Sequence, residues 1–486
     1  MNVIMILIDS LNPRCIGPYG NRFVKTPNLD RFAQRAAVFD GHFAGSLPCM
    51  PARRELMTGR KEFFWRGWGP LEPFDNPVAV EAKRLGAVTA IVTDHYHYWE
   101  NSAHGYLEHF NSIKTIRGHE LDMWNTEPLG ELPGWAKTIE AARPNQGRIY
   151  YNNAKDFQSE KDFFSPRTLS EAADWLDRNH GHEKFFLWTE CFDVHEPFHV
   201  PEPYRSMYTD KLSEDYNLWP PYQNGFHGHT PSFWENVTDD ELEFIRAQYY
   251  GKVTMTDKWL GKLLDKMDRH GLWDNTAVII TADHGHELGE KQRFGKQPPN
   301  YDLNARIPLM VWLPGMTAHR RIGALTTAVD LYPTMLELLG DTSPCSPHGR
   351  SLLPLINGET GSHRDAVVYG TFACGATVTN GDYTYHCTWD PAAELYSYSS
   401  VMLRPSPQAE GGKFIPGVDC PVWKMPYMNE KPVPELLFDR ANDPDQKYDI
   451  SGDQREAVHK MRMLLKRLMN EEGAPPEQYK RLGLID

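Results

Sequence analysis

Within residues 46–60, a cysteine, a proline and an arginine occupy every second position, at 49, 51 and 53. This stretch could carry a reactive group at the start of a helix. Pro51 suits the first helical turn, where its missing N–H costs no hydrogen bond, and Gly59 suits the residue after the last turn. Cys49 is therefore expected beside free N–H groups and the positive end of the helix dipole, which stabilise an anion. Arg53, one turn further on, can face the same point. Because a lone cysteine is more often a small buried apolar residue, the hypothesis depends on the whole pattern.

Metal-ligand residue types follow two apolar runs that are far apart in the chain. Residues 3–8 and 277–281 each predict a buried parallel strand, and they are followed by Asp9 and by Asp283 with His284. Open α/β sheets bind ligands at the carboxyl ends of their strands. Carboxylate and imidazole groups are usual ligands of divalent metals, and the hydroxyl of Ser10 could add a neutral oxygen. We therefore expect these two strand ends to converge on one site.

The pattern Cys-x-Pro-x-Arg at residues 49–53, followed by Met-Thr-Gly-Arg at 57–60, resembles the signature of the sulfatase family. The Asp-His-Gly stretch at 283–285 also resembles that family. The resemblance implies an alkaline phosphatase-like α/β fold, and it implies that Cys49 is converted to formylglycine, whose hydrate is the nucleophile. It also implies one divalent metal, held by Asp9, Asp283, His284 and the formylglycine. Calcium is the metal that the resemblance implies. Relatives often have a second acid where Ser10 stands, and its absence leaves manganese or magnesium as alternatives.

The resemblance assigns further residues to the site. Lys296 is expected to reach the sulfate and the bridging oxygen, and His195, within an Asp-x-His-x-Pro-Phe arrangement, is expected to contact the sulfate. Arg53 is expected to help hold the anionic oxygens. After the strand predicted at 87–93, His97 is a candidate catalytic residue and His95 a candidate substrate-binding residue, although each could equally be a loop histidine without a role. Arg306 is a further candidate for substrate binding.

Three functions are compatible with these residues. The first is metal-dependent hydrolysis of small-molecule or saccharide sulfate esters. The second is hydrolysis of phosphonate monoesters or phosphodiesters on the same scaffold, which the missing second acid at Ser10 favours slightly. The third is a non-catalytic metal- or anion-binding protein, which the intact set from Cys49 to Lys296 disfavours. Relative rates on an aryl sulfate and a phosphonate monoester separate the first two functions, and turnover of neither ester favours the third.

Composition narrows the setting in which this chemistry operates. The 486 residues carry a formal charge of -14, which argues against nucleic-acid binding and against an anionic membrane as partner. Seven scattered cysteines without a CxxC pair suit reduced thiols. Residues 3–8 are too short for a signal or a membrane span. We expect a soluble cytoplasmic enzyme, served by a formylglycine-generating enzyme, that could form a homo-oligomer.

The periodicity predicts a doubly wound, mostly parallel sheet, followed by a smaller antiparallel sheet with one helix. We place the catalytic domain at residues 1–350 and the smaller domain at 351–486. Residues 101–160 are expected to be an irregular insertion over the pocket, and the aromatic stretch 63–69 is either a pocket wall or a loop packed on itself. The expected helices are 30–38, 169–179, 239–270, 330–340 and 457–468. The expected strands are 3–8, 87–93, 185–189, 277–281, 301–314, 366–369, 376–379, 383–387 and 435–439.

Overall fold

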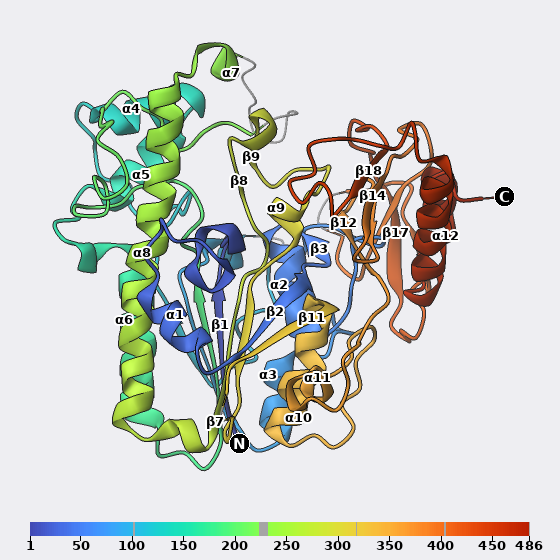
Figure 1. Cartoon of the computed structure of the whole chain (residues 1–486), viewed down its shortest axis with the longest axis horizontal. Helices are drawn as coiled ribbons and strands as arrows, with labels where there is room; N and C mark the ends of the chain where they lie inside the picture. The colour runs from blue at the N-terminus through green and yellow to red at the C-terminus, as the bar shows by residue number, and fades with distance from the viewer. Residues whose placement is uncertain (101–102, 223–231, 317, 403–404, 486) are drawn as a thin grey trace.

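An eight-stranded sheet forms the centre of the computed structural model, which describes residues 1–486 except 101–102, 223–231, 317, 403–404 and 486 (Figure 1). The strand order is β11-β2-β10-β7-β1-β6-β4-β5. Only β10 runs antiparallel to its neighbours in this sheet; every other pairing is parallel. The strands are β1 (Asn2–Ile8), β2 (Ala37–Phe43), β4 (Val88–Thr93), β5 (Ser112–Thr115), β6 (Phe185–Cys191), β7 (Thr276–Thr281), β10 (Leu309–Trp312) and β11 (Arg320–Thr327).

Helices cover both faces of this sheet, because its central strands are apolar on both sides (Figure 1). One face packs against α1 (Pro27–Ala33), α6 (Phe164–Asn179) and α8 (Asp239–Arg269). The other face packs against α2 (Cys49–Thr58), α3 (Val78–Arg84), α10 (Leu331–Leu339) and α11 (Leu353–Asn357). None of the described helices combines the length and the apolar composition that a membrane span requires.

The C-terminal part of the chain adds smaller sheets beside α2 (Figure 1). A five-stranded sheet has the order β18-β14-β13-β12-β3 and is antiparallel except where β12 meets β3, and α12 packs against it. The α/β class with a mostly parallel sheet and a smaller, largely antiparallel one is therefore confirmed. The elements are β3 (Ser46–Leu47), β12 (Val367–Thr371), β13 (Ala376–Thr379), β14 (Tyr383–Cys387), β15 (Tyr396–Ser399), β16 (Glu410–Gly412), β17 (Val422–Pro426), β18 (Leu436–Asp439), α12 (Arg455–Glu471) and α13 (Pro476–Arg481).

Three sequence-based expectations about elements were wrong. The helix expected at 30–38 ends at Ala33, because the next residues join β2 and pair with β10 and β11. The stretch 101–160, of which 101–102 lie outside the described residues, is irregular only in part: between its loops it holds β5 and two helices that bury apolar side chains. The strand expected at 301–314 is a short helix followed by β10. The remaining elements are α4 (Gly134–Ala142), α5 (Gln146–Ala154), α7 (Ser232–Asn236), α9 (Asp302–Ala305), β8 (Glu287–Leu288) and β9 (Phe294–Gly295).

The strand register brings distant sequence positions to one edge of the sheet. Leu7 on β1 lies opposite Thr281 on β7. Asp9 and Asp283 each come two residues later, so they follow adjacent strands at equivalent positions. On the other side of β1, Ile8 lies opposite Cys191 at the end of β6. The carboxyl ends of these parallel strands therefore present their following loops to one place, as expected for an open α/β sheet.

Candidate active site

Asp9 and Asp283 meet where β1 and β7 end, and both side chains are fully buried. The N–H of Ser10 donates to Asp283 Oδ1 at 3.0 Å, and the Ser10 hydroxyl donates to Asp9 Oδ1 at 2.7 Å. Ser10 adopts a φ of 60°, a left-handed conformation that is uncommon outside glycine. Ser10 thus fixes the two carboxylates relative to each other, a role that its hydroxyl and its backbone share.

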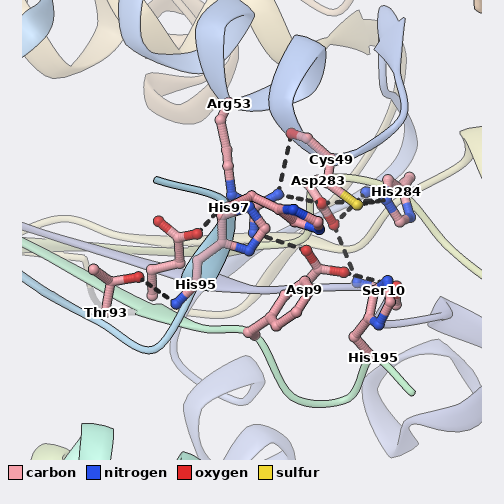
Figure 2. Close-up of polar contacts among 12 residues, drawn as sticks. Asp9, Ser10, Cys49, Arg53, Thr93, His95, His97, His195, Asp283 and His284 are labelled. Carbon is pink, nitrogen blue, oxygen red and sulfur yellow. Dashed lines mark hydrogen bonds and ion pairs between the residues drawn. The ribbon is translucent and has the colours of Figure 1, made fainter. Parts of the chain in front are cut away.

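Cys49 is the first residue of α2, and its thiol faces the imidazole of His284 (Figure 2). The Sγ–Nε2 distance is 3.2 Å, and both side chains are buried. His284 Nδ1 lies 2.9 Å from the carbonyl of Gly285, so this nitrogen carries the proton and Nε2 presents its lone pair towards Cys49. Pro51 lies in the first turn, and the helix ends at Gly59 with a φ of +66°. The expected helix around Cys49 is confirmed.

Asp9, Cys49, Asp283 and His284 form a group that could hold a metal ion. One ligand atom from each lies within 4.8 Å of every other, and all four residues are buried. Burial raises the pKa of Asp9, and the negative charge of Asp283 raises it further. Burial also lowers the pKa of His284 to about 3, which keeps its imidazole neutral. Two crowded carboxylates beside a neutral imidazole are the donors that a divalent cation binds.

Arg53 lies behind this group and pairs with three buried carboxylates. Its guanidinium contacts Asp9 at 2.8 Å, Asp283 at 2.6 Å and Glu190 at 2.6 Å, and it also donates to the carbonyl of Cys49 at 3.1 Å. Every side chain in this network is 0% exposed. Arg53 therefore ties the start of α2 to the ends of β1, β6 and β7, and it balances part of their charge. Four of its five N–H groups donate to these protein partners.

His195 and Lys296 make a second pair beside the carboxylates. His195 Nδ1 donates to the carbonyl of Glu196 at 3.0 Å, so Nε2 is free to accept from Lys296 Nζ at 2.5 Å. Burial and the charge of Lys296 lower the pKa of His195 well below its ordinary value. Burial opposes the charge of Lys296, but acidic neighbours, with Cys49 the strongest, hold its pKa above the usual range. The pair therefore carries one positive charge that points at the Cys49 region.

His95 and His97 lie on the loop after β4, against the aromatic ring of Phe192. His95 is buried, and neither of its ring nitrogens has a hydrogen-bond partner among the described residues. His97 lies 2.9 Å from Glu100 through Nδ1. Phe192 also stacks on His195, with ring centroids 4.4 Å apart. The ring of Phe192 therefore lies between the two loop histidines and the His195–Lys296 pair. The charge of Arg53 acts on His95, whereas His97 lies beside Glu100 and Glu120, and the roles of both histidines stay predictions.

A sulfatase family model matches residues 1–341. The chain belongs to the sulfatase family of sulfuric ester hydrolases. The multifunctional alkaline phosphatase superfamily protein PehA of Trinickia caryophylli is 28% identical over 402 residues, covering 73% of this chain and 77% of PehA. An arylsulfatase of Clostridium perfringens is 24% identical over 75% of this chain and 80% of its own length.

Solved structures of similar proteins confirm the alkaline phosphatase-like sulfatase fold. The phosphonate monoester hydrolase of Agrobacterium radiobacter superimposes with a TM-score of 0.69 at 21% identity, covering 97% of this chain and 95% of that one. The protein BT4656, solved with its substrate D-glucosamine-2-N,6-O-disulfate, gives a TM-score of 0.67 at 16% identity and covers 99% of both chains. At these identities the likeness establishes the fold alone.

One residue predicted for the sulfatase site lies among different neighbours. Arg306 bridges to Phe43 after α9, and its charged neighbours are Asp302, Arg440 and Arg14. No described hydrogen bond or ion pair joins it to the metal-ligand group, and its substrate-binding role stays a prediction.

The aromatic stretch 63–69 divides into a buried part and a partly exposed part. Phe63, Phe64 and Trp65 are buried in the core of the small sheet, while Trp68 is 36% exposed and contacts the ring of His97.

Several residues of this sulfatase site were missed from the sequence. Glu190 accepts from Arg53 and from the hydroxyl of Tyr98, and its only signal was an acid inside the apolar run of β6. His286 contacts Glu196 Oε1 at 2.8 Å. Each of these two residues is close in sequence to a predicted site residue, Glu196 to His195 and His286 to His284, but neither was itself predicted. Lys252 was hidden within the long helix α8, where nothing in the sequence distinguishes it from a solvated lysine.

Proposed function

We propose that this protein hydrolyses sulfate esters through a formylglycine made from Cys49, with one divalent metal ion bound by Asp9, Asp283 and His284. The observation that carries the proposal is the convergence of those three side chains on Cys49 within 4.8 Å at the start of a helix. The hydrated aldehyde would supply a hydroxyl for attack at sulfur, and the metal would acidify that hydroxyl and offset the negative charge of the ester.

The chain's own residues would hold the ester and move protons. Cys49 is the first residue of α2, so the positive end of the helix dipole lies beside it and would favour anionic oxygens there. Arg53 is already bound to three carboxylates, so we infer that it orients Asp9 and Asp283 rather than gripping the sulfate directly. Lys296 brings a positive charge to the bridging oxygen, and with His195 it can deliver a proton to the departing alcohol.

Hydrolysis of phosphonate monoesters or phosphodiesters is the second candidate. The observation that favours it is Ser10, which stands where many sulfatases have a second acid and leaves two carboxylates in the metal-ligand group. The protein named phosphonate monoester hydrolase shares this fold over 97% of the chain, which agrees with this candidate without selecting it.

The deciding experiment is a rate comparison on matched esters. The protein would be co-expressed with a formylglycine-generating enzyme, stripped with chelator, and reloaded separately with Ca²⁺, Mn²⁺ or Mg²⁺. We expect turnover of 4-nitrophenyl sulfate to exceed turnover of a 4-nitrophenyl phosphonate, with Cys49→Ala and Asp283→Asn reducing both to background. Faster phosphonate turnover would favour the second candidate, and turnover of neither ester by metal-loaded, formylglycine-bearing protein would favour the binding role.

The cellular setting is part of the same proposal. All seven cysteines are free thiols, and none is paired. We infer a reducing compartment such as the cytoplasm, where disulfides do not persist. A small-molecule or saccharide sulfate ester is the expected substrate, and a formylglycine-generating enzyme is the expected maturation partner. Mass photometry of the purified protein tests whether it forms a homo-oligomer.

A further inference from the structure

Glu120 is a buried acid beside the candidate active site, and the proposed reaction gives it no role. It is 7% exposed and has a φ of 50°, so its loop is held in a left-handed turn at this residue. Its Oε2 atom lies 3.5 Å from Nε2 of His97 and has no hydrogen-bond partner among the described residues. A buried carboxylate oxygen without a partner costs free energy unless a ligand satisfies it.

The neighbours of Glu120 connect it to the reacting groups. The ring of His97 packs against Phe192 with centroids 5.7 Å apart, and Phe192 stacks on His195, which contacts Lys296. Burial raises the pKa of Glu120 to about 8, so the free protein holds this acid mainly protonated near neutral pH, whereas the positive charge of Lys296 opposes that rise and favours the carboxylate. Glu120 is therefore close enough to sense the charge at the site, but it is separated from Lys296 by aromatic rings.

Aromatic rings and a second acid surround the same position. The rings of Tyr96 and Trp68 lie 4.1 and 4.7 Å from the ring of His97, and burial together with the neighbouring Glu120 raises the pKa of Tyr96. Glu100 contacts the other nitrogen of His97 at 2.9 Å. Trp68 is 36% exposed, so this cluster reaches from solvent inwards. Carboxylates combined with aromatic faces are the chemistry that recognises an organic ammonium group.

We propose that Glu120, with Trp68, Tyr96 and His97, forms the subsite for the alcohol part of the ester, and that this subsite takes an alcohol or phenol bearing an ammonium group. The inference rests on the proposed ester hydrolysis and adds the chemical class of the leaving group. The ammonium would favour the carboxylate form of Glu120, whose proton would leave to solvent, and would pair with Oε2, which has no hydrogen-bond partner among the described residues. Glu120 would then be a specificity-determining residue that touches the substrate.

Two aryl sulfates that differ only in the ammonium group test this directly. Tyramine O-sulfate and 4-ethylphenyl sulfate share the phenol and its ethyl side chain. We expect the wild-type enzyme to favour tyramine O-sulfate by about tenfold in kcat/KM, the scale of one ion pair supported by aromatic rings. Glu120→Gln, which keeps the side-chain shape, should bring the ratio of the two kcat/KM values close to one. Glu108→Gln, an exposed acid on the same segment, should keep the wild-type ratio.

A binding measurement keeps this inference separate from the proposed reaction. Calorimetry with tyramine and 4-ethylphenol needs no turnover, and we expect the wild-type protein to bind tyramine more tightly by a similar factor. Equal binding of the two phenols, or an undiminished preference in Glu120→Gln, overturns the subsite. Turnover of neither sulfate, together with tyramine binding that Glu120→Gln removes, overturns the proposed reaction while supporting the subsite.

Discussion

Replacing Arg53 with methionine removes the one cation that three buried carboxylates share. The guanidinium pairs with Asp9, Asp283 and Glu190 at 2.6–2.8 Å, and all four side chains are 0% exposed. Removing one partner from a buried ion pair costs about 3–5 kcal/mol, because the other charge stays buried without compensation. The cost is not tripled, because the crowded carboxylates can take up a proton. The raised pKa of Asp9, caused by burial and by Asp283, indicates where that proton goes.

The assay is urea and thermal unfolding of chelator-treated protein, so that metal binding does not mask the loss. We expect Arg53→Met to lower the free energy of unfolding by about 3–5 kcal/mol, and the melting temperature of this 486-residue chain by roughly 3–5 °C. The matched control is Arg321→Met, which removes an exposed pair with Asp40 and should cost no more than about 1 kcal/mol. If Arg53→Met were as stable as the control, Arg53 would not be balancing the carboxylates, and our account of the network would be wrong.

Three further predictions follow from the contacts around the site and in the core. Lys252 donates to the carbonyl of His195 at 2.7 Å, so Lys252→Met should lower kcat on aryl sulfates by about 10–100-fold by loosening that loop, with free lysine or ammonium failing to rescue it. Lys296→Ala should lower kcat by about 10²–10⁴-fold, and most for esters of weakly acidic alcohols, which need the proton more; equal losses across a series of leaving groups would contradict the role. Burial lowers the pKa of His42 to about 3, so the unfolded chain takes up a proton below about pH 6.5 that the folded protein refuses. The free energy of unfolding should therefore fall as pH drops from 6.5 towards 4, and His42→Gln should flatten that slope by up to about 1.4 kcal/mol per pH unit, whereas the exposed His459→Gln should leave it unchanged.

The fold and the metal-ligand group could be predicted because their signals are local. The apolar runs of β1 and β7 predict buried strands from composition alone, and the residues after each run then lie at one edge by topology. Pro51 and Gly59 likewise mark the two ends of α2 through local backbone preferences of proline and glycine. Errors arose where tertiary pairing decided the outcome, as at β2, whose partners lie more than 250 residues later in the chain.

The supporting residues could not be predicted because their environment is made by distant segments. Glu120 follows β5 by five residues, and only the folded chain brings it against His97 and Trp68. Lys252 looks like any lysine of a long helix until α8 packs against the loop that carries His195. A single sequence gives no sign that either charge is buried, since burial depends on which elements pack over it.

The central claim is that Cys49 is the precursor of the nucleophile. The most direct measurement is the mass of the tryptic peptide spanning residues 36–53, taken from protein produced together with a formylglycine-generating enzyme. We predict a peptide lighter by the difference between a thiol and an aldehyde side chain, and aryl sulfate turnover that rises with the converted fraction. A peptide that stays unmodified under those conditions, or turnover that is independent of conversion, would contradict the account.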